Sequence, residues 1–319
     1  MSSAIWIVCP VYFDVASFRI LKQRVLDVLT GFAPDQHVRF VVADDSAGAD
    51  PAIDDLRADP EIRVITPPFN LGHQRCIVHA LRVLVRDVRT DDLIVTMDAD
   101  GQDRPEDLAA LLAPLREPGS RTRLVLAKRT SRQESRAFRL SYVLFKLAFR
   151  VLTGTTLATG NFAAFSMSWA RTALLHPYFD LAYSSTLVTF TEAVLVPSPR
   201  GSRYEGRSRM TSSRLVMHGI RLFMPFLDRV AVRSLLAFAV TLVAGIAAAM
   251  VIVGVRLFTD LAIPGWATYT LLLVLLITFV SLGNFVVLFA VFSQSQGISF
   301  SSLERSETEL AREPPSCTG

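Results

Sequence analysis

Short apolar runs alternate with longer segments of helical periodicity through the first half of the chain. Brief apolar runs bounded by turn-forming residues are typical of buried strands, and they predict strands at 5–12, 38–43, 63–66, 93–97 and 123–127. Apolar residues spaced along one helix face predict helices at 18–30, 73–88, 105–115 and 134–152. Because helices separate the strands and acidic residues follow two successive strands, the pattern predicts an α/β fold with a parallel sheet and right-handed crossovers.

The pattern is weaker after the last of these helices. We predict that Gly160, Asn161, Phe162 and Ser166 form a turn into a region of small residues, and that 195–197 is the last strand. No internal repeat is visible in the sequence.

Two long runs without a charged residue dominate the carboxyl-terminal part of the chain. The first, 234–255, lies between Arg233 and Arg256, and at about 1.5 Å per residue it would extend about 33 Å, enough to cross a bilayer core. A loop at 258–265 joins it to the second run, 266–292. Two spans return the chain to the side on which it entered, and the arginine-rich flank predicts that this side is the cytoplasm.

Basic residues recur at helical spacing just before the first run. Arg207, Arg214 and Arg221 are seven residues apart, so a helix would align them. The opposite face would carry Met210, Leu215, Met217, Ile220, Phe223, Met224 and Leu227. This pattern predicts an amphipathic helix at the membrane surface, bent near Pro225.

A second basic row accompanies the helix predicted at 134–152. Arg132, Arg136 and Arg139 recur at helical spacing beside a wide apolar face. Such a row suits phosphate binding, a membrane-facing position or an ordinary solvated face.

These features divide the chain into an α/β domain at 1–205, the amphipathic segment at 206–230, the spans at 231–293 and a polar tail at 294–319 that is predicted to be disordered.

Apolar residues make up 51% of the chain and the mean hydropathy is +0.38, as expected for a protein with a membrane part. Cys9, Cys76 and Cys317 lack metal-ligand spacing, which argues against a zinc site or disulfide framework and indicates a reducing compartment. No secretory signal is expected at the start of the sequence, because no basic segment precedes its first apolar run.

A burst of carboxylates follows the strand predicted at 93–97. In extended backbone alternate residues point the same way, so Asp98, Asp100 and Gln102 are predicted to present oxygens to one point. Such a donor set suits Mg²⁺ or Mn²⁺ holding a substrate diphosphate. It would lie at the carboxyl ends of the strands, where open α/β sheets bind ligands.

The same stretch has an alternative interpretation as an acidic turn that caps the next helix. Asp103 with Glu106 fits a capping box, and Pro105 suits a first helical turn. Capping accounts for Asp103 and Glu106 but does not require Asp98 or Asp100.

Taken together, these stretches resemble the family-2 glycosyltransferases of the dolichyl-phosphate mannose synthase and bacterial polyprenyl-phosphate glycosyltransferase type. The resemblance covers about residues 5–210 and rests on seven segments before a two-span hairpin: 9–12, 44–46, 70–72, 97–106, 128–129, 160–162 and 206–210. Those enzymes have a GT-A fold and move a sugar from a nucleotide donor to a polyprenyl phosphate. The resemblance therefore implies a GT-A (Rossmann-like) fold and the same reaction here.

The resemblance also implies roles for individual residues. The nucleotide would be held by Pro10, Tyr12, Asp14, Asp44, Asp45 and Asp98. The metal and diphosphate would be held by Asp98, Asp100 and Gln102. The catalytic residues would be Asp100, Asp103, Arg129 and Arg132, of which the arginines would meet donor or acceptor phosphate. The acceptor phosphate and membrane side would involve Arg136, Ser208 and Arg209.

The chain departs from this family at several positions. Where one branch has an Asp-Thr-Gly-Asp-Phe motif, Ala158 and Asn161 replace both acidic residues. Phe13 and Asp14 stand where Asn-Glu usually follows the first-strand Tyr, and Ala127 begins the Gly-x-Arg motif. These changes leave the predicted metal site intact and bear on the donor and on any base in that loop.

We therefore predict a membrane-anchored, inverting, metal-dependent glycosyltransferase of the bacterial inner membrane, with its catalytic domain in the cytoplasm. Its partners would be a UDP- or GDP-linked sugar, an undecaprenyl-type phosphate and the bilayer. Nucleic acid is not expected, and homo-oligomerisation is left open.

The choice of acceptor bears on the need for a base. A phosphate monoester is largely dianionic at neutral pH, since its second pKa is about 6, and it needs no proton removed. A hydroxyl of another lipid or glycan would need a base, for which Asp103 is the nearby carboxylate. A catalytically silent scaffold is the alternative from another class, whereas a processive synthase is not expected because the sequence lacks a Gln-x-x-Arg-Trp stretch and further spans.

Overall fold

The computed structural model describes residues 3–118, 120, 122–130, 136–156, 159–180, 182–190, 192–205, 212–259 and 265–295. The chain forms two compact units. The first comprises the described residues up to Ser141 and those from 159 to Pro225. The second comprises those from Tyr142 to Thr156 and from Phe226 to Ser295.

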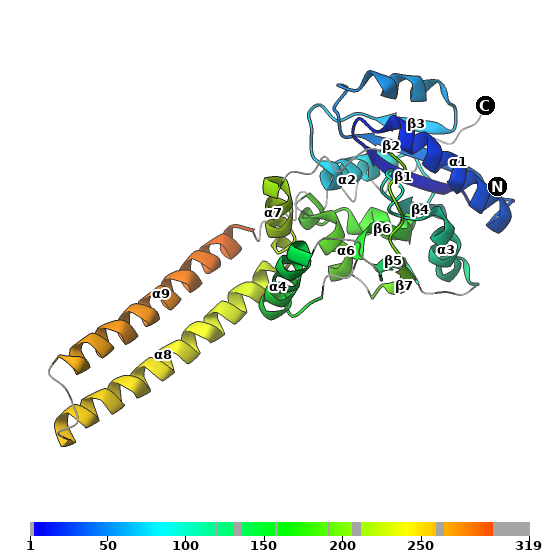
Figure 1. Ribbon diagram of the computed structural model, residues 1–319. Coiled ribbons are helices and arrows are strands. Elements are labelled where there is room, and N and C mark those ends of the chain that lie inside the picture. Colours follow the sequence, from blue (N-terminus) through cyan, green and yellow to red (C-terminus); the bar gives the residue numbers. More distant parts are fainter. Residues whose placement is uncertain are drawn as a thin grey trace. The chain divides into compact units, whose positions relative to one another are not determined.

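A mixed seven-stranded sheet forms the centre of the first unit (Figure 1). Its strands are β1 (Ile5–Val11), β2 (Val38–Asp44), β3 (Ile62–Ile65), β4 (Leu93–Thr96), β5 (Leu124–Arg129), β6 (Thr159–Ser166) and β7 (Val194–Ser198). Their order across the sheet is β3-β2-β1-β4-β6-β5-β7. Strand β6 runs antiparallel to β4 and β5, and the other neighbouring pairs are parallel.

Strand β6 corrects two predictions. The turn predicted at 160–166 is wrong, because these residues form a strand, and the sheet is mixed rather than wholly parallel. Strand β6 contains glycine, asparagine and alanine, which are poor strand formers, so its sequence does not predict a strand. Pairing with a neighbour on each side outweighs that local preference.

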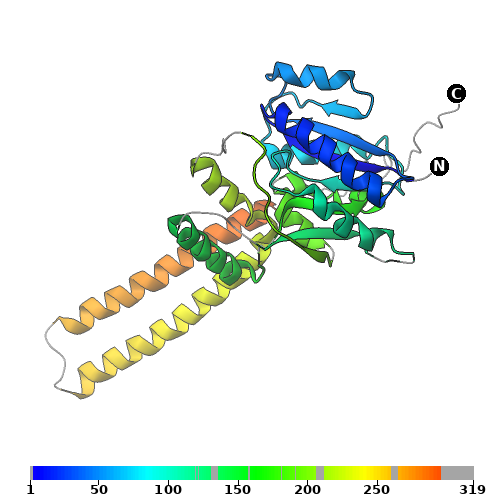
Figure 2. The same ribbon diagram turned by 45° about the vertical axis from the view of Figure 1, so that its right-hand side comes forward.

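Helices cover both faces of the sheet (Figures 1 and 2). Alternate strand residues point to opposite faces, so Ile5, Ile7 and Cys9 share one face while Trp6 and Val8 share the other. The first face is covered by α1 (Val15–Phe32), the 3₁₀-helix η1 (Pro51–Ala58) and α3 (Leu108–Arg116). The second is covered by α2 (His73–Leu84), α5 (Met167–Ala173), the 3₁₀-helix η3 (Pro177–Asp180) and α6 (Tyr183–Phe190).

The predicted helices are present with shifted ends. Helix α1 extends the prediction at 18–30 in both directions, and α2 ends earlier than the predicted residue 88. The segment predicted at 105–115 begins with a 3₁₀ turn, η2 (Pro105–Asp107), before α3. Such differences at helix ends are common, because the terminal turns adopt 3₁₀ geometry easily.

The second unit contains two long apolar helices that pack side by side, α8 (Leu227–Phe258) and α9 (Trp266–Ser295). A Cβ added at Gly245 would lie 3.0 Å from Thr278 Oγ1, and Phe238 stacks on Phe285, so the packing is close. In the described chain two helical segments are long and apolar enough to cross a membrane, Gly219–Phe258 and Trp266–Val291.

Hydrogen bonds join the end of α4 (Arg136–Thr153) to the start of α8 within this unit. Arg233 donates to the backbone carbonyls of Arg150 and Val151, and Arg229 donates to Thr155 Oγ1 over 2.9 Å. Upstream, α7 (Ser212–Arg221) and the 3₁₀ turn η4 (Met224–Phe226) precede α8. The tail from residue 296 and residues 206–211 lie outside the described residues.

Candidate active site

Three strands of the first unit end at one edge of the sheet and bring their loops together. Strand β1 is parallel to both β2 and β4, so the residues after Val11, Asp44 and Thr96 emerge side by side. The buried thiol of Cys9, on β1, lies close to the carboxylates that follow β4. Burial raises its pKa, and the negative charges of Asp98 and Asp103 add to the shift.

The carboxylates after β4 lie in a turn rather than in extended backbone. Strand β4 ends at Thr96, and Gly101 has a φ of +87°. The alternation on which the single convergence point was predicted therefore does not extend past Thr96. We call the turn at 97–104 the acidic loop.

Asp103 holds the acidic loop together and does not cap the next helix. Its Oδ2 accepts a hydrogen bond of 2.9 Å from the backbone N–H of Asp98, and its Oδ1 lies 3.5 Å from Arg129 Nη2. The N-cap position of η2 is Arg104, whose side chain makes no capping bond. The capping-box interpretation of Asp103 with Glu106 is therefore wrong.

The environment of Asp103 favours its neutral form. Only 3% of the residue is exposed. Burial and then the nearby charge of Asp98 raise the pKa of Asp103 to about 7, while Arg129 opposes the shift. Gly160 leaves room for this arginine, because a Cβ there would lie 2.7 Å from Arg129 Nη2.

Asp98 faces strand β6. Its Oδ1 accepts a hydrogen bond of 3.1 Å from Asn161 Nδ2. The side chain of Asn161 thus touches Asp98 at a position where an aspartate would repel it. The sequence marks Asn161 as part of a turn and as a replacement for a carboxylate, but nothing in it indicates this contact with Asp98.

Asp100 and Gln102 face a second segment, 199–205, which follows β7. Asp100 Oδ2 lies 2.7 Å from Arg203 Nη2, and the Gln102 side chain accepts from Arg200. Backbone bonds from Gly201 N to Gln102 O, 2.9 Å, and from Tyr204 N to Asp100 O, 3.0 Å, join the two segments. Sequence reasoning missed this segment, because nothing local links it to residues a hundred positions earlier.

Two glycines make this close approach possible. A Cβ on Gly201 would lie 2.3 Å from the carbonyl oxygen of Gly101, and one on Gly101 would lie 2.8 Å from the Tyr204 ring. The backbones can therefore touch only because both positions lack a side chain.

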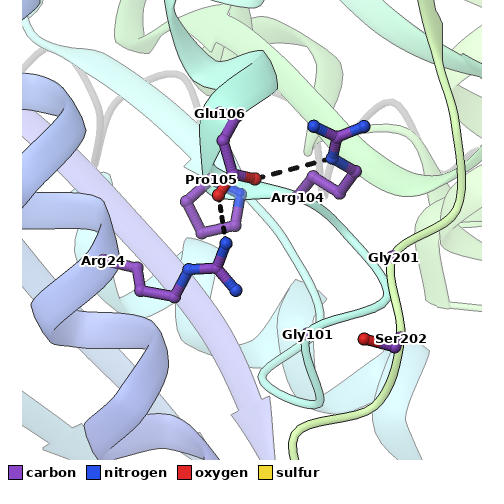
Figure 3. A pocket seen from close by; sticks show the side chains of 7 residues that line it. All are labelled: Arg24, Gly101, Arg104, Pro105, Glu106, Gly201 and Ser202. Carbon is purple, nitrogen blue, oxygen red and sulfur yellow. Dashed lines mark hydrogen bonds and ion pairs between the residues drawn. The ribbon is translucent and has the colours of Figure 1, made fainter.

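A pocket on the α1 side borders the same contact (Figure 3). Its lining residues are Arg24, Gly101, Arg104, Pro105, Glu106, Gly201 and Ser202. Arg24 and Arg104 both form ion pairs with Glu106, and Arg24 Nη1 donates to Tyr204 Oη over 3.3 Å. Glu106 therefore helps to tie α1 to the acidic loop and to the 199–205 segment.

The residues predicted to hold the nucleotide lie at the ends of β1 and β2. Asp44 builds the turn after β2: its carboxylate accepts from Ser46 N, Ser46 Oγ, Gly48 N and Thr66 Oγ1. Asp45 is buried, and its carbonyl accepts from Asn70 Nδ2. Pro10, Tyr12 and Asp14 are half-buried at or just after the end of β1.

Four predicted site residues lie wholly or partly outside the described part of the chain. Arg132, Ser208 and Arg209 lie outside the described residues. Arg136 begins α4, and the structure describes its backbone but not its side chain.

The donor chemistry of the acidic loop fits a hard divalent cation. Carboxylates and an amide oxygen are ligands that Mg²⁺ and Mn²⁺ accept, and such ions need few protein ligands when waters and a diphosphate supply the rest. Burial and the charge of Asp98 raise the pKa of Asp100, a repulsion that a cation would relieve. Within the described ranges, no three His, Cys, Asp or Glu side chains already converge as a metal-binding group.

Comparison with known protein families agrees with this architecture. The glycosyl transferase family 2 model matches residues 6–174, more than half of the chain. The chain therefore belongs to glycosyl transferase family 2 and is a glycosyltransferase that uses a nucleotide sugar. Its first unit is a GT-A-like α/β domain, as predicted, and the two long apolar helices follow it.

Solved structures with a similar chain path include glucosyl-3-phosphoglycerate synthase from Mycobacterium tuberculosis in complex with Mn²⁺, UDP and phosphoglyceric acid. It is 15% identical, with a TM-score of 0.46 over 72% of this chain and 79% of that one. A mycobacterial protein is 18% identical, with a TM-score of 0.48 over 72% and 75% of the two chains. At these values the similarity assigns neither an acceptor nor a metal to this chain. No curated protein sequence matches it significantly.

Proposed function

We propose that this glycosyltransferase moves a sugar from a UDP- or GDP-linked donor to a polyprenyl phosphate of the undecaprenyl type, at the cytoplasmic face of a bacterial inner membrane. The observation that carries the proposal is the pair of membrane-length helices, α8 and α9, in the same chain as a family-2 catalytic domain. An enzyme that modifies a membrane lipid needs its domain held at the bilayer, whereas one with a soluble acceptor does not.

The end of α4 supports the membrane part of the proposal. Val143, Leu144, Leu147 and Val151 are each 58–60% exposed, although all are large and apolar. They belong to the same unit as α8 and α9. An exposed apolar row of this kind is expected where lipid rather than water covers it.

The donor diphosphate would bind at the acidic loop. Asp98, Asp100 and Gln102 would hold a Mg²⁺ or Mn²⁺ ion, with Arg129 as a positive charge beside them. The metal would stabilise negative charge on the departing nucleoside diphosphate. Arg129 would orient a phosphate, which lowers the entropic cost of bringing donor and acceptor into line.

The surroundings of Asp103 favour a phosphate acceptor over a hydroxyl acceptor. A base must reach the proton that it removes, but both carboxylate oxygens of Asp103 already face the loop backbone and Arg129. Position 161 supplies an amide instead of a carboxylate. A phosphate oxygen can attack the anomeric carbon directly, with inversion, while the bond to the nucleoside diphosphate breaks.

The test is sugar transfer by the purified full-length protein in detergent. We expect one UDP- or GDP-sugar to label undecaprenyl phosphate in the presence of Mn²⁺, and EDTA to stop transfer reversibly. Asp98→Asn and Asp100→Asn should each abolish it. Transfer to a glycan or lipid hydroxyl but not to the phosphate would contradict the proposed acceptor. Full activity in EDTA would contradict the proposed metal requirement.

A further inference from the structure

A chain of buried side-chain amides ends on Asp98. Gln74, on the first turn of α2, donates from Nε2 to Ser184 Oγ over 2.8 Å and to Asn161 Oδ1 over 3.1 Å. Asn161 then donates from Nδ2 to Asp98 Oδ1 over 3.1 Å. Gln74, Asn161 and Ser184 are all at most 8% exposed, so water does not compete for these bonds.

The bonds of Gln74 determine which end of the Asn161 amide faces Asp98. A primary amide nitrogen has two hydrogens, and Gln74 uses one for Ser184 and one for Asn161. Asn161 must therefore accept with its oxygen and present its nitrogen to Asp98. In the reverse orientation the Asn161 oxygen would face a carboxylate, and two acceptors would oppose each other.

The backbone of Asn161 is fixed as well. Thr96 Oγ1 lies 2.6 Å from the carbonyl oxygen of Asn161 and donates its only hydrogen there. Tyr183 Oη, 2.8 Å from Thr96 Oγ1, must then be the donor in that pair. Asn161 is thus held through both its main chain and its side chain, and it can hold Asp98 in turn.

We propose that Gln74 is a positioning residue that acts through Asn161 on Asp98. With Oδ1 bound by Asn161, Oδ2 is the oxygen that remains to meet the donor's metal or nucleotide. Oδ2 has no hydrogen-bond partner in the described part of the chain. The inference rests on the proposed role of Asp98 in donor binding. Mutation of a partner that orients a ligating side chain in this way typically lowers metal affinity or activity by about 10- to 100-fold.

The test compares variants at Gln74 by isothermal titration with UDP and with GDP, each in the presence of Mn²⁺. Gln74→Glu keeps the shape and, when ionised, offers only acceptors, so Asn161 should then reverse its amide and turn its oxygen to Asp98. Gln74→Met removes the bond without adding a charge, which keeps the test valid if Gln74→Glu does not fold. Both variants should bind the better nucleotide about 10- to 100-fold more weakly than the wild type.

Two further variants separate positioning from general destabilisation. Ser184→Ala removes the other partner of Gln74 but leaves its bond to Asn161, so it should bind nucleotide within about threefold of the wild type. Adding Gln74→Met to Asn161→Ala should weaken binding no further than Asn161→Ala alone, because Gln74 acts through that residue. Wild-type affinity in a folded Gln74→Met, or additive losses in the double variant, would overturn the inference.

A ligand-free readout distinguishes this inference from the proposed function. In a crystal structure of Gln74→Met the Asp98 carboxylate should leave its position beside Asn161. If wild type bound no nucleoside diphosphate, the role proposed for Asp98 would fail, yet this structure would still report on the contact. Unmoved Asn161 and Asp98 side chains would contradict the positioning role whatever the substrate.

Discussion

The residue that the sequence left most ambiguous, Asp103, has a defined position in the structure. It bridges the Asp98 backbone and Arg129, so its carboxyl group holds the acidic loop in shape. We expect Asp103→Asn to lower stability by about 1–3 kcal/mol, because the amide has one acceptor oxygen and cannot serve both the Asp98 N–H and Arg129. The folded variant should retain transfer to lipid phosphate within a few-fold, with the same pH profile as the wild type.

The rate at saturating donor, metal and acceptor, measured after thermal unfolding has confirmed folding, checks this prediction. A loss of about a thousandfold that is rescued at high pH would instead identify Asp103 as a base and favour a hydroxyl acceptor.

At the scale of elements, the 199–205 segment depends on backbone contact with the acidic loop. Gly201→Ala would place a methyl group 2.3 Å from the Gly101 carbonyl, and backbone cannot yield as a flexible side chain can. The segment should therefore detach from Gln102 and Asp100. We expect faster amide exchange over 199–205 and at least a tenfold loss of transfer, because Arg203 would lose its place beside Asp100. Ser202→Ala, one residue away and exposed, should match the wild type in both measurements.

An ion pair joins α1 to the residues just before β3. Lys22 Nζ lies 2.6 Å from Asp59 Oδ2, and this hydrogen bond, partly opposed by burial, lowers the pKa of Asp59. Because the folded pKa lies below the unfolded value of about 3.9, the stabilisation is present above that pH and is lost as the pH falls through the folded pKa. Lys22→Met should lower the free energy of unfolding by at most about 1 kcal/mol at pH 7, since Asp59 is one-third exposed. Urea unfolding should show a smaller difference from wild type at pH 2 than at pH 7, because Asp59 and Glu61, which Lys22 also contacts over 3.1 Å, become protonated. An equal difference at both pH values would exclude the ion pair.

At the scale of the whole molecule, the proposed topology predicts which positions face the outside of the cell. Phe258, at the end of α8, is 85% exposed, and Glu205 is exposed on the catalytic unit. Cys9 and Cys76 are buried, so a Cys317→Ser background leaves no other accessible thiol in the described chain. In intact cells an impermeant maleimide should label Phe258→Cys, whereas Glu205→Cys should react only after lysis. The reverse pattern would contradict a cytoplasmic catalytic domain.

Local sequence determined the elements whose chemistry is contained within a few neighbouring residues. Strands β1 and β4 are apolar runs, β2 is apolar from Phe40 to Ala43, and α8 and α9 are uncharged over membrane length, so the hydropathy pattern predicted them. The acidic loop was found for the same reason, because its carboxylates are adjacent in the chain.

Tertiary structure decided everything that depends on partners distant in sequence. Strand β6 exists because β4 and β5 pair with it, although Gly160 and Asn161 do not favour a strand. Asp103 holds the acidic loop and does not cap the next helix, because it binds the Asp98 backbone and Arg129, which lies 26 positions later in the chain. Gln74 and Arg203 act on the acidic loop through contacts that no local pattern encodes. Hydrophobic periodicity specifies what an element is, but only packing specifies which side chains meet.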